Sequence, residues 1–332
     1  MKYILILIFF TASMACIGQS TGRPEQRTGI QENFNTINLG KNNTLIALKK
    51  QAWSAAANAV HWWSYFLALD HDETIPDEMK KAEMENCITQ ASRFIKDSWQ
   101  YNLMLFIQSG KKEKNLVMKA LSLANEKTLI YPYLVQYAII ANDKQTLTEY
   151  ANKLNETNPL SPNLYEYHYN TLMSATQGAH IYAQGIADLV SLAMVQASGI
   201  RKDIDLRYYD APVVQKENAY LCLSLGKTII SSYPKAFYTG LLICLDEAKD
   251  FTELKDHIEN DFKFSFISQQ RTLMPGEIPL YKNYLPALIL LYKSYGKATP
   301  MKEFVKKKIE YIAKQVNMEA RVNEILKTAA PL

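Results

Sequence analysis

The sequence predicts a mainly α fold in which tetratricopeptide-like (TPR-like) helical hairpins flank a small parallel β-α-β-α-β segment. Three observations support this fold class. Apolar residues recur at helical spacing over most of the chain after residue 43. Short polar breaks such as SGKKEK and TNPLSP separate these runs, as between helices stacked side by side. The region from about 178 to 260 instead alternates short apolar runs with helical ones.

The chain begins with the features of a secretory signal peptide. Lys2 precedes the apolar run ILILIFF, and small residues follow it. This run is too short to span a bilayer, which takes about 20 apolar residues. Two processing routes fit: removal of residues 1–18, or lipid modification of Cys16 as in a bacterial lipoprotein. Either route exports the protein to the periplasm or the outer-membrane surface.

Two segments follow the signal peptide. Residues 19–43 are polar and have no periodicity, so we expect a flexible linker there. Residues 44–176 are expected to form a helical-repeat domain. TLIALKKQAWSAAANAVHWWSYFLAL has apolar residues at helical spacing, and IPDEMKKAEMENC opens with a proline and two acids, which favour a helix start. KNLVMKALSLANEK, YPYLVQYAIIAND and KQTLTEYANKLNE are predicted to be further helices.

Residues 177–270 are expected to form the small α/β segment. A strand that ends at Gly185 is predicted from AHIYAQG. A helix that ends at Gly199 is predicted from IADLVSLAMVQASG, and a second strand from DIDLRYYD. VVQKENAYLCLSLGKTIISSY is predicted to be one helix, KAFYTGLLI a third parallel strand, and FTELKDHIENDF a third helix. This order predicts a parallel sheet with right-handed connections.

Residues 271–332 are expected to form a C-terminal helical hairpin. The stretch YKNYLPALILLYKSYGKATPMKEFVKKKIEYIAKQV has the pattern of a helix, a glycine-containing turn and a second helix. In the second helix the expected buried face comprises Phe304, Val305, Ile309 and Ile312, and the lysines form the solvated face.

The ends of the predicted strands suggest a ligand-binding site. In an open parallel sheet, ligands bind beyond the carboxyl ends of the strands. Gly185, Asp188 and Asp210 lie at those ends. The helix that begins near Ile186 would direct free N–H groups to the same place. Asp188 would either bind a ligand there or stabilise its own helix dipole, and Asp210 would either bind a ligand or form a turn.

Composition and motifs reduce the number of functions that the sequence supports. The net charge of +4 is modest for 332 residues and does not indicate a nucleic-acid-binding face. G-x-S-x-G, H-E-x-x-H and P-loop motifs are absent from the sequence, so we assign no catalytic residue, no metal site and no cofactor. Cys87, Cys222 and Cys244 form no C-x-x-C pair. One disulfide would be compatible with export, but apolar neighbours favour three buried thiols.

About 35 residues of the α/β segment resemble part of a known family. This family is DUF2723, large membrane proteins similar to protein O-mannosyltransferases. Its soluble segment carries a Gly-Asp-Asn-Asp-Thr turn, a helix with glutamine, and then Gly-x-Arg-x-Asp-Val. The matching residues here are Gly185, Asp188, Gln196, Gly199, Arg201 and Asp203, with Ile204 in place of valine.

The resemblance has limits in this chain. Ile186, Ala187 and Leu189 replace the first aspartate, the asparagine and the threonine of the turn, so most of its polar chemistry is missing. The membrane-spanning transferase domain is missing too, so that activity does not carry over. NAVHWWSYFLAL also resembles a helix of exported helical-repeat proteins of the Bacteroidetes that carry a similar α/β segment. These resemblances imply architecture and location more than activity.

Two functions are compatible with these features. The first is a non-catalytic scaffold that binds another envelope or outer-membrane protein through its helical repeats, attached to the membrane only if Cys16 is lipidated. The alternative is an enzyme or ligand binder that acts on an envelope glycan or peptide, with its site near Gly185 and Asp188. The alternative requires several polar groups to converge at the strand ends.

Overall fold

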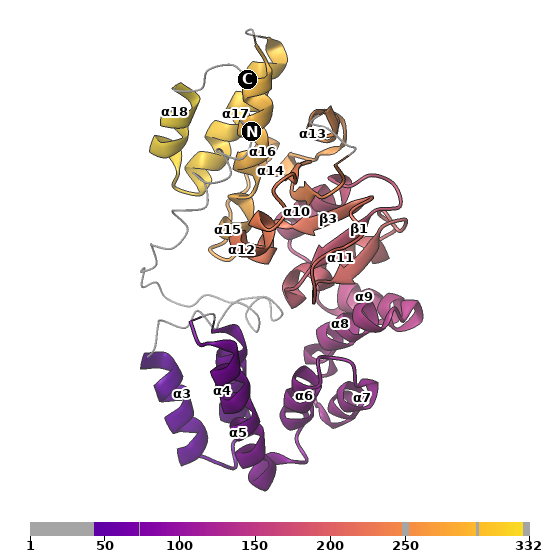
Figure 1. The fold of residues 1–332 in the computed structure, drawn as a ribbon, viewed down its shortest axis with the longest axis vertical. Coiled ribbons are helices and arrows are strands. Elements are labelled where there is room, and N and C mark those ends of the chain that lie inside the picture. Colours follow the sequence, from indigo (N-terminus) through magenta and orange to yellow (C-terminus); the bar gives the residue numbers. More distant parts are fainter. Residues whose placement is uncertain (1–42, 73, 248–251, 297–298, 328–332) are drawn as a thin grey trace. The chain divides into compact units, whose positions relative to one another are not determined.

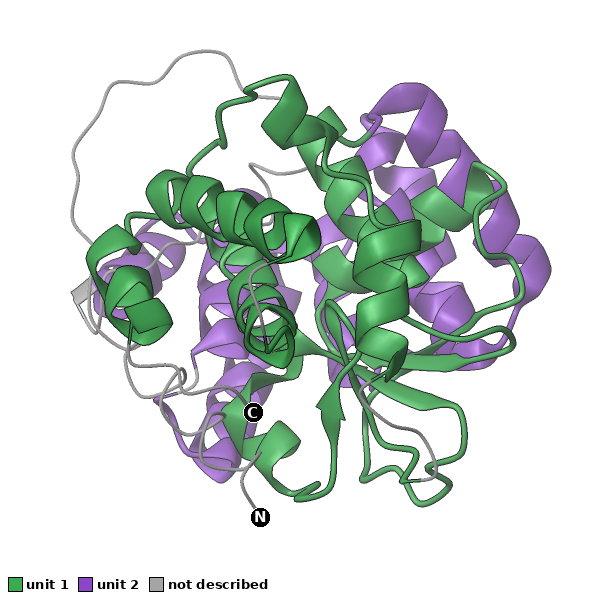
Figure 2. Cartoon of the chain, turned by 90° about the horizontal axis from the view of Figure 1, so that it is seen from above, with its two compact units in different colours: residues 1–26, 160–332 green, residues 27–159 purple. Residues whose placement is uncertain are grey.

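A computed structural model of the chain describes residues 43–72, 74–247, 252–296 and 299–327. The chain divides between Pro159 and Leu160 into two compact units (Figure 2). The first unit is helical, and the second combines helices with one five-stranded sheet. The prediction of a mainly helical fold around a small β segment is therefore confirmed.

The first unit consists of helices that pack in sequential pairs. α3 packs against α4, α4 against α5, α6 against α7 and α8 against α9 (Figure 1). Short turns join the members of each pair, as the polar breaks predict. The helices are α3 (Asn43–Ser54), α4 (Ala59–His71), α5 (Asp77–Ile95), α6 (Trp99–Gln108), α7 (Lys114–Leu123), α8 (Tyr131–Ala141) and α9 (Lys144–Thr157), with the 3-10 turn η1 (Lys127–Leu129) before α8.

Polar side chains determine where these helices begin and end. The Asn58 side chain accepts a 2.9 Å hydrogen bond from the backbone N–H of Val60, which separates α4 from α3 within one apolar run. Between α8 and α9, Asn142 adopts a left-handed conformation with φ of 53° and ends α8. Asp143 then caps α9 by accepting a 3.0 Å bond from the N–H of Thr146. Two residues thus suffice to reverse the chain.

The second unit begins at α10 (Pro162–Met173), a helix that the sequence analysis included in the helical-repeat domain. Its sheet has the order β2-β1-β3-β5-β4. The elements from the sheet onward are β1 (His180–Ala183), α11 (Ile186–Ala197), β2 (Asp205–Tyr208), β3 (Ala219–Cys222), η2 (Leu223–Leu225), α12 (Gly226–Ser231), β4 (Phe237–Tyr238), β5 (Leu242–Cys244), α13 (Thr252–Asp256) and the π-helical turn η3 (His257–Asp261).

The first half of the sheet follows the prediction. β1 pairs in parallel with β2, with His180 opposite Asp205, and in parallel with β3, with His180 opposite Ala219. α11 is the connection between β1 and β2, and it packs against α10 and β2. The β-α-β order at the start of the segment is therefore confirmed.

Two predicted elements of the sheet are wrong. Residues Ala219–Cys222, expected inside a long helix, form β3, and all four are buried. A short apolar run that is buried on both faces has no alternation to distinguish it from a helix. The expected third parallel strand is instead an antiparallel hairpin of β4 and β5. It reverses at Gly240, whose φ of 134° suits glycine.

The C-terminal part is the predicted helical hairpin with one further helix. α16 packs against α17, and α18 packs on α17. Together with α10 and the segment before α16, they surround a core rich in tyrosine and phenylalanine. The helices are α14 (Ser265–Ser268), α15 (Ile278–Tyr281), α16 (Tyr284–Ser294), α17 (Pro300–Gln315) and α18 (Glu319–Lys327). Within the part of the chain described, no helix is long and apolar enough to cross a membrane.

The predicted buried and solvated faces of α17 need two corrections. Val305, Ile309 and Ile312 are fully buried as expected, but Phe304 is 47% exposed. Lys308, expected on the solvated face, is only 7% exposed. Lys308 lies three residues after Val305 and four before Ile312, so helical spacing places it on the buried face.

Candidate functional site

Gly185 and Asp188 lie where the sequence analysis expected them, at the carboxyl end of β1. Gly185 precedes α11, and Asp188 lies in the first turn of that helix. The Asp188 carboxylate lies close to the Gly185 backbone, since a Cβ placed on Gly185 would lie 3.8 Å from Asp188 Oδ2. β3 runs parallel to β1, so the residues that follow Cys222 reach the same edge of the sheet.

Asp188 faces the interior of the unit. It is half-buried, and burial raises the pKa of its carboxyl group above the ordinary value. A hydrogen bond with the side chain of Ser224 opposes part of this increase. Ser224 is exposed and lies just beyond β3. A buried carboxyl group with a raised pKa is a feature that recurs at functional sites.

Two further polar groups lie near Asp188. Burial and the charge of Asp188 both raise the pKa of the Tyr167 hydroxyl on α10 and of the Cys222 thiol. Asn283 Nδ2 donates a 2.9 Å hydrogen bond to Tyr167 Oη. The cluster of Tyr167, Asp188, Cys222 and Ser224 is hereafter called the strand-end cluster. Of these residues only Asp188 was predicted, because Tyr167 lies on α10 and the other two lie in a segment that was predicted as helix.

Asp210 is not part of this cluster. It lies two residues beyond β2 and its side chain is exposed. Neighbouring residues form a packed turn instead: Tyr233 Oη accepts a 2.7 Å bond from the Val213 N–H and lies 3.4 Å from Tyr209 Oη. A role as a turn residue therefore describes Asp210 better than a role as a ligand.

The residues that match the DUF2723 pattern after the turn have structural roles. Gln196 Nε2 donates to the carbonyl groups of Arg201 and Ile204, at 2.9 and 2.8 Å. The Arg201 guanidinium donates to backbone carbonyls at the end of α10 and pairs with Asp203 at 3.0 Å. Arg201 lowers the pKa of Asp203 to about 2. These contacts fix the loop between α11 and β2 against α10.

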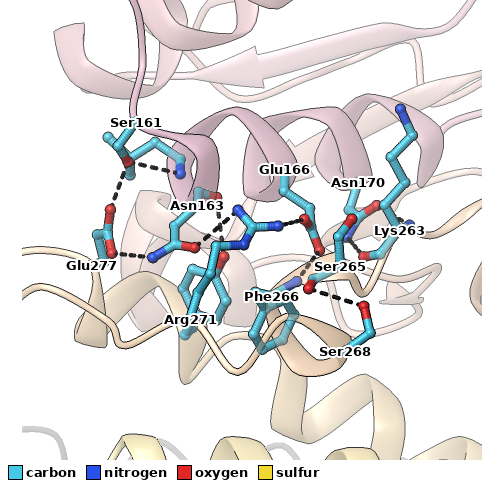
Figure 3. Close-up of polar contacts among 12 residues, drawn as sticks. Ser161, Asn163, Glu166, Asn170, Lys263, Ser265, Phe266, Ser268, Arg271 and Glu277 are labelled. Atoms are coloured by element: carbon cyan, nitrogen blue, oxygen red, sulfur yellow. Dashed lines mark hydrogen bonds and ion pairs between the residues drawn. The ribbon is translucent and has the colours of Figure 1, made fainter.

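A second polar cluster joins α10 to the segment between α13 and α15 (Figure 3). The Glu277 carboxylate is fully buried and accepts hydrogen bonds from Ser161 Oγ at 2.7 Å, Asn163 Nδ2 at 2.8 Å and the Met274 N–H at 3.0 Å. Glu166, also buried, pairs with Arg271 Nη2 at 2.6 Å. Because almost all of its donors and acceptors are satisfied within the protein, this cluster is structural.

The sequence carries a weak signal for this second cluster. Asn163, Glu166 and Asn170 recur every three or four residues, so they share one face of α10. Such a face would ordinarily be solvated, but here it is buried. Asn170 donates to the Lys263 carbonyl at 2.7 Å and to Tyr284 Oη at 2.8 Å. Sequence spacing reveals the face and gives no information about its burial.

Possible metal ligands and cysteines can be located within the described residues. Over the described ranges, no group of three or more His, Cys, Asp and Glu side chains is arranged to hold a metal ion. Cys87, Cys222 and Cys244 are buried free thiols, as the sequence analysis favoured. Cys16, the lipidation candidate, lies outside the described residues.

None of the protein-family models, curated proteins or solved structures with which the chain was compared matches it.

Proposed function

We propose that this chain is a non-catalytic interaction protein that binds a protein partner through its helical hairpins. The observation that carries the proposal is one exposed apolar face on α3. Ile46 is 69% exposed and Trp53 is 38% exposed. Seven residues separate them, which is close to two helical turns, so both lie on the same side of α3.

The α3 face, defined by Ile46, Lys50 and Trp53, combines properties typical of protein interfaces. Trp53 is held in place by Trp62 and Tyr65 of α4, with ring centroids 4.5 and 5.6 Å away. An ordered, half-exposed tryptophan loses little entropy on binding, and tryptophan is enriched at binding hot spots. Lys50, exposed between the two apolar residues, adds a positive charge to the rim. A partner with an apolar centre and acidic periphery would suit this face.

The proposal includes export to the cell envelope. It is supported by the basic and apolar start of the sequence, MKYILILIFF, followed by small residues. We propose that the partner is an envelope or outer-membrane protein. Lipid attachment at Cys16 would add a membrane anchor, and cleavage after residue 18 would release the protein into the periplasm.

A matched pair of variants tests the interaction. Ile46→Asp places a charge in the α3 face, and Met79→Asp places one on α5 at a residue with similar exposure, 64%. Both positions lie near the start of their helices, where an acid is tolerated. We expect a partner that co-purifies from envelope fractions with wild type and Met79→Asp to be lost from Ile46→Asp. Equal recovery with all three would refute the role of α3.

The strand-end cluster supports a second candidate function, which is binding of an envelope glycan or peptide. Asp188 and Ser224 provide a carboxyl and a hydroxyl group, which suit a polar ligand rich in hydroxyl or amide groups. Purified peptidoglycan fragments are the appropriate probe. We expect Asp188→Asn and Ser224→Ala each to weaken their binding about tenfold, and Asp97→Asn, at an exposed acid of the first unit, to leave it unchanged. Equal binding by all variants would exclude this site.

A further inference from the structure

The exposed α3 face begins only a few residues after the N-terminal part of the chain. α3 starts at Asn43, and residues 1–42 lie outside the described residues. On α3, Ile46 is 69% exposed and Trp53 is 38% exposed, and Lys50 between them is exposed as well. The residues just before α3 are therefore the nearest candidates along the chain to cover this face.

The stretch TGIQENFNTINLG, residues 28–40, carries the start and stop signals of a helix. Thr28 is followed three residues later by Gln31, which is the spacing of a capping box at a helix start. Gly40 is the residue type that most often follows the last turn of a helix. These signals predict a helix over residues 29–39.

The predicted helix would have one apolar side. Ile30, Phe34 and Ile37 follow each other at intervals of four and three residues, which places them on the same side. Residues 19–43 contain too little apolar surface to become ordered alone, and isolated helices shorter than about 12–15 residues are marginal in water. Such a helix needs an apolar surface to pack against, and only residues 40–42 separate it from the α3 face.

The short connection determines which residues would face each other. Two antiparallel helices are commonly joined by two to five residues, and residues 40–42 provide three. Both helices rise by the same distance per residue, so facing residues lie equally far from the connection along the chain. Within one position, this rule gives three facing pairs: Ile37 with Ile46, Glu32 with Lys50, and Ile30 with Trp53.

The three pairs are complementary in chemistry. Apolar residues would meet at both ends of the contact, and an acid would meet a base between them. A second copy of α3 suits the face less well. A two-fold axis that pairs Ile46 with Trp53 of another chain would bring Lys49 and Lys50 of both chains together, and like charges that face each other oppose association.

We propose that residues 29–39 form a helix that packs on the α3 face and that a protein partner must displace this helix to bind. The displacement rests on the function proposed for α3, whereas the contact within the chain does not depend on it. A covered face lowers the apparent affinity for a partner in proportion to the fraction of molecules in which the face is free. Weakening the helix contact should therefore strengthen partner binding.

Disulfide trapping in the full chain tests the contact. Ile46→Cys is combined with Ile37→Cys in one variant and with Asn35→Cys in the control, since position 35 lies on the opposite side of the predicted helix. Under mild oxidation we expect the 37–46 bond to form about tenfold faster than the 35–46 bond, because a disulfide requires its Cβ atoms within about 4.5 Å. Peptide mass spectrometry distinguishes these bonds from those of native cysteines. Equal rates would overturn the proposal.

Hydrogen exchange of the wild-type chain provides a measurement that needs no substitution. We expect the amides of residues 33–39 to exchange at least about tenfold more slowly than those of residues 19–27, because helical hydrogen bonds protect them. Equal exchange over both ranges, after correction for sequence, would overturn the proposal.

Co-purification from envelope fractions tests the displacement. Ile37→Asp weakens the helix contact and should raise recovery of the partner about threefold, while Asn35→Asp, on the opposite side, should recover as much as wild type. Equal recovery with Ile37→Asp and wild type would overturn the displacement. Selective trapping of the 37–46 pair without any partner would refute the function proposed for α3 and support the helix contact. Unselective trapping with a partner still recovered would do the reverse.

Discussion

Replacing Glu277 tests whether the polar cluster on α10 holds the second unit together. Glu277→Ala would remove the acceptor of three hydrogen bonds, those donated by Ser161 Oγ, Asn163 Nδ2 and the Met274 N–H. Hydrogen bonds to a charged group contribute about 1.5–3 kcal/mol each, and water entering the vacated space would restore part of that. We therefore expect the free energy of unfolding of the second unit to fall by about 3–5 kcal/mol. Glu277→Gln keeps the shape of the side chain and should lower the free energy of unfolding by less.

The distribution of tryptophan allows the two units to be followed separately. All four tryptophans precede residue 100, so their fluorescence reports on the first unit only. Far-UV circular dichroism reports on both units. In urea, Glu277→Ala should move the dichroism transition to lower concentration by more than the fluorescence transition. Glu310→Ala, at an exposed acid 3.9 Å from Lys306, should change stability by less than about 0.5 kcal/mol. A Glu277→Ala effect as small as that of Glu310→Ala would refute the structural role of the cluster.

Three further predictions concern other positions. Lys308→Met should raise the melting temperature most below pH 8 and progressively less toward pH 10.5. The pKa of Lys308 is lower in the folded than in the unfolded state, so the stability of the wild type rises with pH across that range and the advantage of the variant shrinks. A difference in melting temperature between variant and wild type that does not change with pH would contradict this prediction. Asp143→Ala should destabilise the first unit by about 1–2 kcal/mol in urea, since the α9 cap and the 2.8 Å contact with Lys114 are lost; an unchanged fluorescence midpoint would disagree. Gly240→Ala should lower the dichroism midpoint strongly, because the new Cβ would lie 2.6 Å from the Phe262 ring at a φ of 134°; wild-type stability would show that the hairpin adapts.

The sequence predicts helices better than strands in this chain because the helices are longer and show their apolar periodicity over more residues. In α9, Tyr150, Ala151 and Leu154 recur at helical spacing and are all buried. β3 offers four buried residues, AYLC, and no alternation. Its burial depends on β1 and β5, which flank it from positions distant in sequence. Local pattern therefore cannot distinguish it from the helix that follows.

In the candidate site, too, the sequence predicts what depends on local pattern and misses what depends on contacts between distant segments. Asp188 was found because it follows a glycine at the end of a predicted strand. Its partner Ser224 and its neighbour Tyr167 come from segments 36 and 21 residues away along the chain, and only the folded sheet brings them together. Lys308 was placed on the solvated face because lysine is usually exposed. Its Nζ lies 3.7 Å from the ring centroid of Phe264, a residue that the sequence does not associate with α17.

Site-specific photo-crosslinking can show in cells whether the α3 face binds a protein partner. A photoreactive phenylalanine analogue would replace Ile46 in the full chain, and Phe94 on α5, 56% exposed, in the control. After irradiation in intact cells, mass spectrometry would identify what is attached. We expect one discrete envelope protein to be crosslinked from position 46 and none from position 94. Crosslinks from both positions to the same unselective mixture, or none from position 46, would contradict it.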